Sequence, residues 1–226
     1  MRREAALFAI AVSGLLGQSA GSAVWNEFSI GAPSKGPNNF SLYGIRTSQV
    51  TMKKALARAY DVPEHRVVGP DWLPTERYAI TAQVNDAKDF QLLFQQELAA
   101  RFHLLAHREM KNVPVYALKS IEGGSLKQPP PSPAGGRGEI SAMSIKITGS
   151  SVKAFANTLA DVIERPVFDE TGMGGNFDFY VAWKHGNLPS LEAAVKEQLG
   201  MQLVEERRSV ELLIVDHIEK LQFPEQ

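Results

Sequence analysis

The chain has 226 residues, contains no cysteine, and carries 24 basic and 25 acidic residues, which give a formal charge of −1 at neutral pH. A near-neutral chain lacks the basic patch that nucleic-acid binding requires, so no nucleic-acid partner is expected. Without cysteine there are no disulfides, and the fold must be stabilised by burial of apolar surface, which a chain of this length can provide.

Residues 1–23 have the pattern of a signal peptide. Arg2 and Arg3 are basic, the stretch from Ala5 to Leu16 is apolar, and Gly21-Ser22-Ala23 supplies the small residues of a cleavage site. The apolar stretch is shorter than the ~20 residues that span a bilayer. We therefore expect cleavage after Ala23, no stable membrane insertion, and a periplasmic or secreted protein. An uncleaved N-terminal anchor is the alternative.

A glycine- and proline-rich segment, residues 122–142, divides the remaining chain into residues 24–121 and 143–226. This composition is typical of a linker or a long exposed loop. Residues 40–118 and 143–217 on either side of it share one order of apolar residues at similar spacing. The sequence therefore predicts an internal duplication; the alternative is that any two units of this kind look alike once gaps are allowed.

The first helix expected in each half is amphipathic, at Thr51–Tyr60 and at Ser151–Ile163, and follows an entry strand. Apolar residues recur at the helical spacing, and Thr51 or Ser48 in the first half and Ser151 in the second are suited to cap the first turns. Alternating apolar and polar residues then predict strands at 78–84 and 177–183. The other expected elements are entry strands Phe40–Ile45 and Met143–Thr148, second helices at 90–98 and 191–199, and paired strands at 102–108 and 113–116 and at 201–207 and 212–215. A short strand is also expected at Glu27–Ile30.

The predicted fold class is therefore α+β: two tandem related repeats, each with two helices packed on a mainly antiparallel sheet. A unit of roughly 75 residues has only a marginal core of its own. Two such units gain stability if they pack together and share a core.

Several motifs occur along the chain, among them Val68-Gly69-Pro70-Asp71-Trp72-Leu73, Asp169-Glu170-Thr171-Gly172 and Val215-Asp216-His217. Together they resemble a family of uncharacterised exported proteins that is abundant in soil bacteria, chiefly acidobacteria. The resemblance covers nearly all of the chain after residue 23 and implies an exported soluble domain without an established reaction. Each repeat also resembles, more weakly, the short N-terminal domain of secretins and TonB receptors, which binds partner proteins at the envelope.

The segment Asp169-Glu170-Thr171-Gly172 invites comparison with aspartic proteases. Glu170 interrupts the Asp-Thr-Gly motif that those enzymes need, and the aligned first-half residue is Gly69, so a pair of carboxylates sharing one proton is not indicated. The simpler reading is a turn in which the side chains of Asp169 and Thr171 bond the backbone. Asp178, which aligns with Ala79, is a second carboxylate present in one half only.

Asp71 and Trp72 lie in the rigid segment Gly69–Pro74, where the tryptophan either packs on the core or serves as a binding anchor. His103 and His107 have the spacing of a helical metal site, but Phe102–Arg108 alternates like a strand, on which residues four apart stand ~13 Å from each other. No metal or cofactor is expected, and both imidazoles are expected on a polar sheet face beside acidic groups or water.

These observations favour a non-enzymatic binding or interaction module at the cell envelope. It would bind a protein, peptide or envelope glycan through the lobe interface or an exposed sheet edge. The alternative is an extracytoplasmic hydrolase with its site in the cleft between the lobes, using Asp169, Asp178 or a histidine. No catalytic residue is assigned from the sequence.

Overall fold

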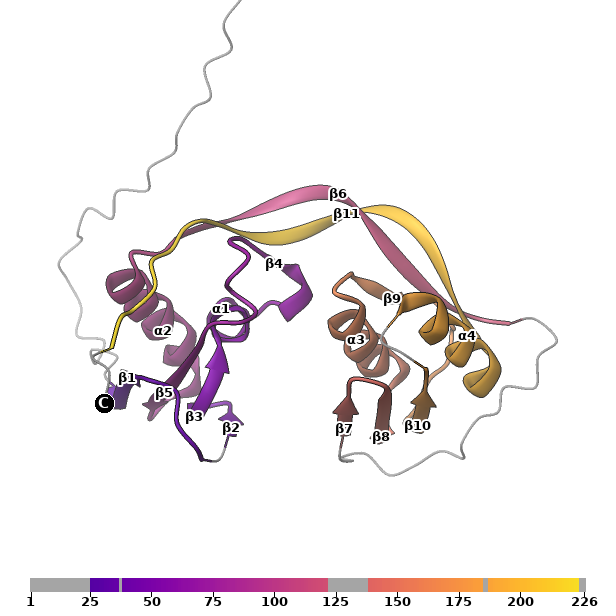
Figure 1. Cartoon of the computed structure of the whole chain (residues 1–226), viewed down its shortest axis with the longest axis horizontal. Coiled ribbons are helices and arrows are strands. Elements are labelled where there is room, and N and C mark those ends of the chain that lie inside the picture. Colours follow the sequence, from indigo (N-terminus) through magenta and orange to yellow (C-terminus); the bar gives the residue numbers. More distant parts are fainter. Residues whose placement is uncertain (1–24, 37, 122–137, 185–186, 224–226) are drawn as a thin grey trace, which may run out of the picture.

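The computed structural model describes residues 25–36, 38–121, 138–184 and 187–223, and within these ranges it contains four α-helices and eleven strands in three mainly antiparallel sheets (Figure 1). The α+β class expected from the sequence is thereby confirmed. The expected signal peptide, and residues 122–137 of the expected linker, lie outside the described residues. No helix in the described part of the chain is long and apolar enough to cross a membrane.

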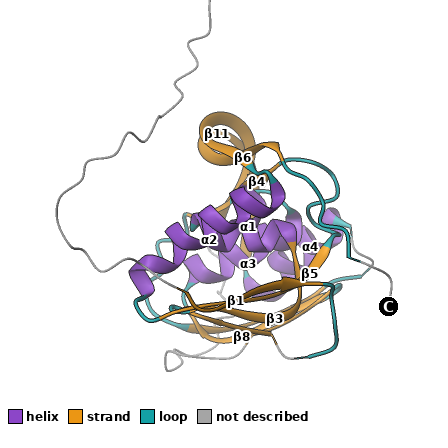
Figure 2. Cartoon of the chain, turned by 90° about the vertical axis from the view of Figure 1, so that its left-hand side faces the viewer, coloured by secondary structure: helices purple, strands orange, loops and turns teal. Residues whose placement is uncertain are grey.

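The first lobe is a four-stranded sheet with two helices on one face (Figures 1 and 2). Its strands run in the order β1-β5-β3-β2, and all pairs are antiparallel. The elements are β1 Trp25–Gly31, β2 Asn38–Ser41, β3 Gly44–Thr51, α1 Met52–Tyr60, the 3₁₀ turn η1 Glu64–Arg66, β4 Val67–Val68, β5 Arg77–Val84 and α2 Ala87–Phe102.

The second lobe repeats this arrangement with three strands, in the order β10-β8-β7. Its elements are β7 Gly138–Ser141, β8 Ser144–Ser150, α3 Val152–Ile163, β9 Val167–Asp169, β10 Phe177–Ala182 and α4 Leu188–Leu199. From the first hairpin onward the two lobes have the same order of helices and strands, except that η1 occurs only in the first. A common origin by duplication stays a prediction.

The third sheet joins the lobes. β6 (Leu105–Ser120) and β11 (Met201–His217) pair antiparallel along their whole length and form a ribbon that crosses above the helices of both lobes (Figures 1 and 2). Near one end of this ribbon β4 pairs parallel with β11, and near the other β9 pairs parallel with β6. The prediction of two short strands at the end of each half is therefore wrong, because each half ends in one long strand.

The ribbon exchanges the last strands of the two halves. Leu213 and Val215, at the end of the second half, are buried in the core of the first lobe. Tyr116 and Leu118, at the end of the first half, are buried in the core of the second lobe. Each core is therefore completed by the other half of the chain, and neither half closes its own core alone.

The helix starts follow from local capping. The side chains of Thr51 and Ser151 accept hydrogen bonds from Lys54 N and Ala154 N, as the sequence suggests, and so satisfy a donor that the first helical turn leaves free. α1 and α3 end at residues with left-handed backbone, Asp61 and Glu164.

Three expected boundaries change. The entry strand expected at Phe40–Ile45 is a hairpin, since the chain turns between β2 and β3 at residues 42–43. Residues 138–141 of the expected linker form β7, which pairs with β8. His103 is not on a strand: it ends α2 with a left-handed backbone, φ 48°, and only His107 lies on β6.

Candidate functional site

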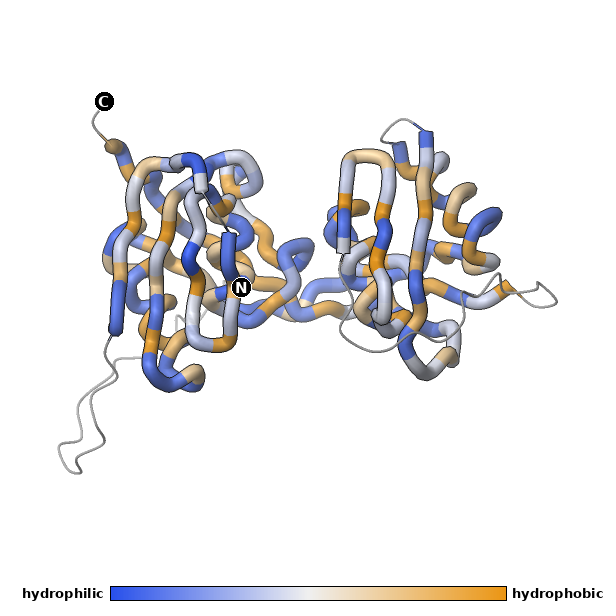
Figure 3. Tube along the Cα trace, turned by 90° about the horizontal axis from the view of Figure 1, so that it is seen from below, coloured by the Kyte–Doolittle hydropathy of each residue, from blue (hydrophilic) through white to orange (hydrophobic). Residues whose placement is uncertain are grey.

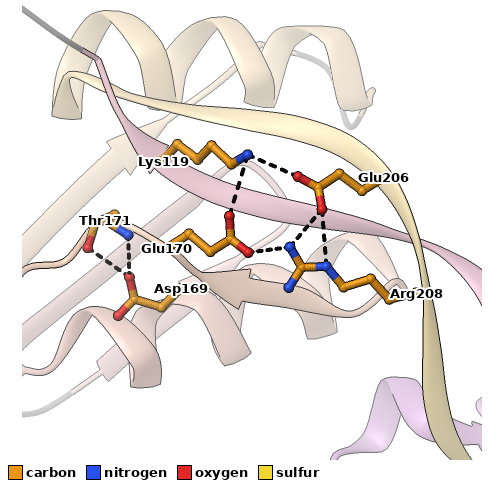
Figure 4. A network of polar contacts seen from close by, with 6 residues as sticks. All are labelled: Lys119, Asp169, Glu170, Thr171, Glu206 and Arg208. Carbon is orange, nitrogen blue, oxygen red and sulfur yellow. Dashed lines mark hydrogen bonds and ion pairs between the residues drawn. The ribbon is translucent and has the colours of Figure 1, made fainter.

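The loop at Asp169 is held by its own side chains (Figure 4). Oδ1 of Asp169 accepts hydrogen bonds from the backbone N–H of Thr171, at 3.0 Å, and from its hydroxyl, at 2.7 Å. The Thr171 hydroxyl oxygen in turn accepts from Met173 N at 3.2 Å. This is the turn that the simpler reading of the sequence describes, and it commits the Asp169 carboxylate to the backbone.

Glu170 belongs to an ion-pair network on the ribbon (Figure 4). Lys119 on β6 lies 3.4 Å from the carboxylate of Glu170 and 3.0 Å from that of Glu206, and Arg208 on β11 contacts both carboxylates. Hydrogen bonds from Arg208 are the largest influence that lowers the pKa of Glu170 and of Glu206. The four charges balance one another, so the network fastens the loop to the ribbon.

Asp178 hydrogen-bonds the backbone of another segment, at Gly149. Its Oδ1 accepts a hydrogen bond from the backbone N–H of Gly149 at 2.7 Å. Gly149 has a left-handed φ of 59°, and the pairing of β10 with β8 shifts register between Phe177 and Phe179. Asp178 therefore stabilises a bulge in β8. The structure does not bring Asp178 into contact with Asp169.

Trp72 packs partly buried against the first core, and the ammonium group of Lys220 lies 5.3 Å from its ring centroid. Its carbonyl oxygen accepts hydrogen bonds from Thr75 and Glu76, which closes the loop. Asp71 beside it is exposed and faces a cavity described below. Of the predicted site residues, only Asp71 lines a cavity at the junction of the lobes.

His103 and His107 each have an acidic partner, as expected. Nδ1 of His103 lies 2.9 Å from Glu219, and Nδ1 of His107 lies 2.7 Å from Asp216. Nε2 of His217, the residue after Asp216, lies 3.2 Å from the carboxylate of Glu219. In the parts of the chain that the structure describes, no group of three or more His, Cys, Asp or Glu residues is placed to hold a metal ion.

The sequence did not reveal the junction between the lobes, which we call the seam: η1 of the first lobe against the end of α3 of the second. Nδ1 of His65 lies 2.9 Å from Oδ1 of Asp161, and the His65 side chain is only 2 % exposed. The carboxylate fixes the N–H of the imidazole on Nδ1. Ninety-six residues separate the partners, so no local pattern indicates the contact.

A cavity of about 290 Å³ opens at the seam. Its polar lining residues are His65, Lys53, Asp71 and Glu164, and Glu164 comes from the second lobe. Its apolar lining comes from the segment around β4, namely Val67, Val68, Gly69, Pro70, Leu73 and Pro74. Charges of both signs and an apolar surface thus share one concave site.

Acidic groups are crowded at the seam. The pKa of Glu64 is raised, and burial of its side chain is the largest cause. The negative charges of Asp161 and Glu164 raise this pKa further, whereas the positive charges of Lys53 and Lys54 lower it. The raised pKa of Glu64 and the buried side chain of His65 both lie on η1, which makes this turn part of the candidate site, although Glu64 itself lines a separate cavity and not the one at the seam.

The fold and the seam define a two-lobed α+β protein in which the lobes exchange their last strands and share one cavity. The chain belongs to the family described as protein of unknown function (DUF3738), which it matches over residues 53–218. That range includes the second lobe, the ribbon, the seam and the first lobe from Lys53 of α1 onward, whereas β1, β2 and β3 precede it. The match confirms the expected membership of a family of unknown function. Comparison with curated proteins and with solved structures gave no match.

Proposed function

We propose that this protein is a non-catalytic binding module of the cell envelope, and that its ligand is a protein or peptide segment that enters the seam cavity. The observation that carries the proposal is that Glu164 of the second lobe lines the cavity together with residues of the first lobe, so a ligand that reaches Glu164 would contact both lobes at once. An envelope glycan is the other class of ligand under test.

The lining supports a peptide. Lys53 is placed for a carboxylate, Asp71 and Glu164 for a cationic group, and the valines and prolines between them for an apolar side chain. A short polypeptide segment carries all three kinds of group together, whereas a neutral glycan uses neither charge.

The test is selection of ligands from a displayed peptide library and from an array of envelope glycans with the purified protein. We expect peptides to be enriched, and their affinity to fall at least about tenfold in Lys53→Glu, since one charge-assisted hydrogen bond is replaced by repulsion. Lys146→Glu is the matched control, because Lys146 is an exposed lysine on β8 that does not line the cavity. Ligands that bind Lys53→Glu as tightly as the unaltered protein would contradict the seam as the site.

Export is part of the proposal and rests on residues 1–23. Mass spectrometry of the protein secreted by a Gram-negative host should show a chain that begins at Val24. Recovery of the intact N-terminus from the soluble periplasmic fraction would contradict cleavage.

A hydrolase is the second candidate, and His65 is the observation that favours it. An imidazole held by a carboxylate through Nδ1 is arranged as a general base at Nε2. None of the residues that line the cavity is Ser, Thr or Cys, so the nucleophile would be a water molecule. Turnover of ester or peptide substrates that is lost in both His65→Ala and Asp161→Asn would establish the hydrolase, and its absence supports the binding module.

A further inference from the structure

The outer edge of β10 differs from its counterpart in the first lobe. β10 ends the sheet of the second lobe, with β8 on one side and no described strand on the other. β5, which occupies the corresponding place in the first lobe, is covered by β1 (Figures 1 and 3). The second sheet therefore has an open edge where the first has a fourth strand.

The backbone groups on this edge can be assigned from the register. Trp183 N donates to Met143 O at 3.0 Å, so the backbone of Trp183 points toward the hairpin of β7 and β8. Because hydrogen-bonding direction alternates along an antiparallel strand, the N–H and C=O of Ala182 and Tyr180 point outward. A strand added at this edge would bond these groups.

The side-chain amide of Gln198 on α4 forms hydrogen bonds with the backbone of one residue on this edge, Ala182. Its Oε1 accepts from Ala182 N at 3.0 Å, and its Nε2 donates to Ala182 O at 2.7 Å. The side-chain amide thus supplies the donor and acceptor that a neighbouring strand would supply. The aligned residue of α2, Glu97, pairs with Arg101 instead, and there the edge is covered by β1.

Tyr180 is the next outward residue, and its side chain is 60 % exposed. Phe179 and Val181 on either side are buried against the helices. The edge therefore offers outward backbone groups beside a buried apolar face, a combination that promotes pairing with another strand.

β1 shows which kind of segment fits such an edge. It runs antiparallel to β5, with Phe28 opposite Ala82 and Ile30 opposite Ile80. Trp25 at its start packs edge-on against Phe90 of α2, at 6.2 Å between ring centroids. Its apolar residues thus lie on the helix-facing side, and Ser29 and Glu27 remain exposed.

We propose that the outer edge of β10 binds an extended segment of a partner protein by antiparallel strand addition. The segment carries apolar side chains at alternate positions, which lie over α4 as those of β1 lie over α2. The Gln198 amide is displaced from Ala182 when the added strand extends past Tyr180. This surface is separate from the seam cavity, so either proposal can fail without the other.

The probe is a synthetic peptide with the sequence of residues 24–32, titrated into isotope-labelled protein that begins at Val24 and retains β1. We expect chemical-shift changes and slowed hydrogen exchange at the amides of Tyr180 and Ala182, and no change along β5. Absence of binding at millimolar peptide would overturn the proposal, as would changes confined to β5, β2 or β7.

Tyr180→Pro tests the backbone contact. Proline removes the outward N–H and is tolerated where an edge N–H faces solvent. We expect the affinity for the peptide to fall about tenfold or more, as for loss of one backbone hydrogen bond together with a steric clash. Tyr180→Ala keeps the N–H and is expected to bind within about threefold of the unaltered protein. Equal binding by both variants would overturn the proposal, and far-UV circular dichroism verifies that each is folded.

Discussion

At the scale of single residues, two carboxylates that stand out in the sequence, Asp169 and Asp178, serve the fold. Most residues of the candidate site do not stand out in the sequence, and Asp71, which lines the cavity, is the exception. Asp169 closes a turn and Asp178 holds a bulge. His65 and Asp161 lie far apart in the chain and meet only because η1 reaches α3. A turn is encoded locally and can be predicted, whereas a contact between lobes depends on the whole topology.

Glu64, on η1 at the seam, should make the free energy of unfolding depend on pH. Its pKa is raised by burial, so the folded state binds this proton more tightly than the unfolded state. The free energy of unfolding should therefore fall as the pH rises from the unfolded pKa, ~4.3, through the raised folded pKa. Glu64→Gln removes this loss and should be more stable than the unaltered protein at pH 7, with the difference vanishing below pH ~4.

Urea denaturation at a series of pH values measures this difference. Glu139→Gln, at an exposed carboxyl on β7, is the control and should leave the curve unchanged. A Glu64→Gln variant that is less stable at pH 7 would show that the attraction of Lys53 and Lys54 outweighs burial.

At the scale of elements, the four helices and the caps of the first helix in each half could be predicted, and the ribbon could not. Thr51 and Ser151 begin the first helix of each half, and apolar spacing marks the rest of the helix. The centre of β6 is exposed on both faces from Arg108 to Asn112 and contains Pro114. Residues 108–112 show no alternation of apolar and polar side chains, so the sequence pattern predicts two short strands separated by a break instead of one long strand.

Gly69 should be intolerant of a side chain because β11 passes close to it. A Cβ atom at this position would lie 2.8 Å from Val215 Cβ and 2.8 Å from Leu73 Cδ1. The leucine can rotate, but Cβ of Val215 is fixed to the backbone of the exchanged strand. Gly69→Ala should therefore lower the free energy of unfolding by about 1–3 kcal/mol, the usual cost of overpacking.

Chemical denaturation of Gly69→Ala measures this loss. Gly174→Ala is the matched control, since a Cβ there meets no atom within 4 Å, and it should change stability by less than about 0.5 kcal/mol. Equal stability of the two variants would mean that β11 does not pass Gly69 as closely as described.

At the scale of the whole molecule, the two cores are coupled by the exchanged strands. The first core contains Leu213 of β11 and the second contains Leu118 of β6, and β6 and β11 pair along the entire ribbon. Opening one lobe withdraws a strand from the sheet that supports the other. Two lobes connected by a flexible linker alone would unfold independently.

Leu213→Ala should therefore destabilise both lobes. The side chain is fully buried, so its truncation should cost about 2–5 kcal/mol. With Trp25 and Trp72 replaced by phenylalanine, Trp183 fluorescence reports on the second lobe alone. We expect Leu213→Ala to lower the midpoint of this signal together with that of far-UV circular dichroism, in a single transition. A Trp183 transition unaffected by Leu213→Ala would show that the lobes unfold independently.

The exchanged strands also set the order in which the chain can fold during synthesis. Domains generally fold from the N-terminus as the ribosome releases them. Here the first lobe lacks Leu213, Val215 and Ile218 until residue 218 has emerged, so its core stays incomplete while the second half of the chain is made. For a protein that is exported, as proposed above, both cores therefore remain incomplete until β11 has been made.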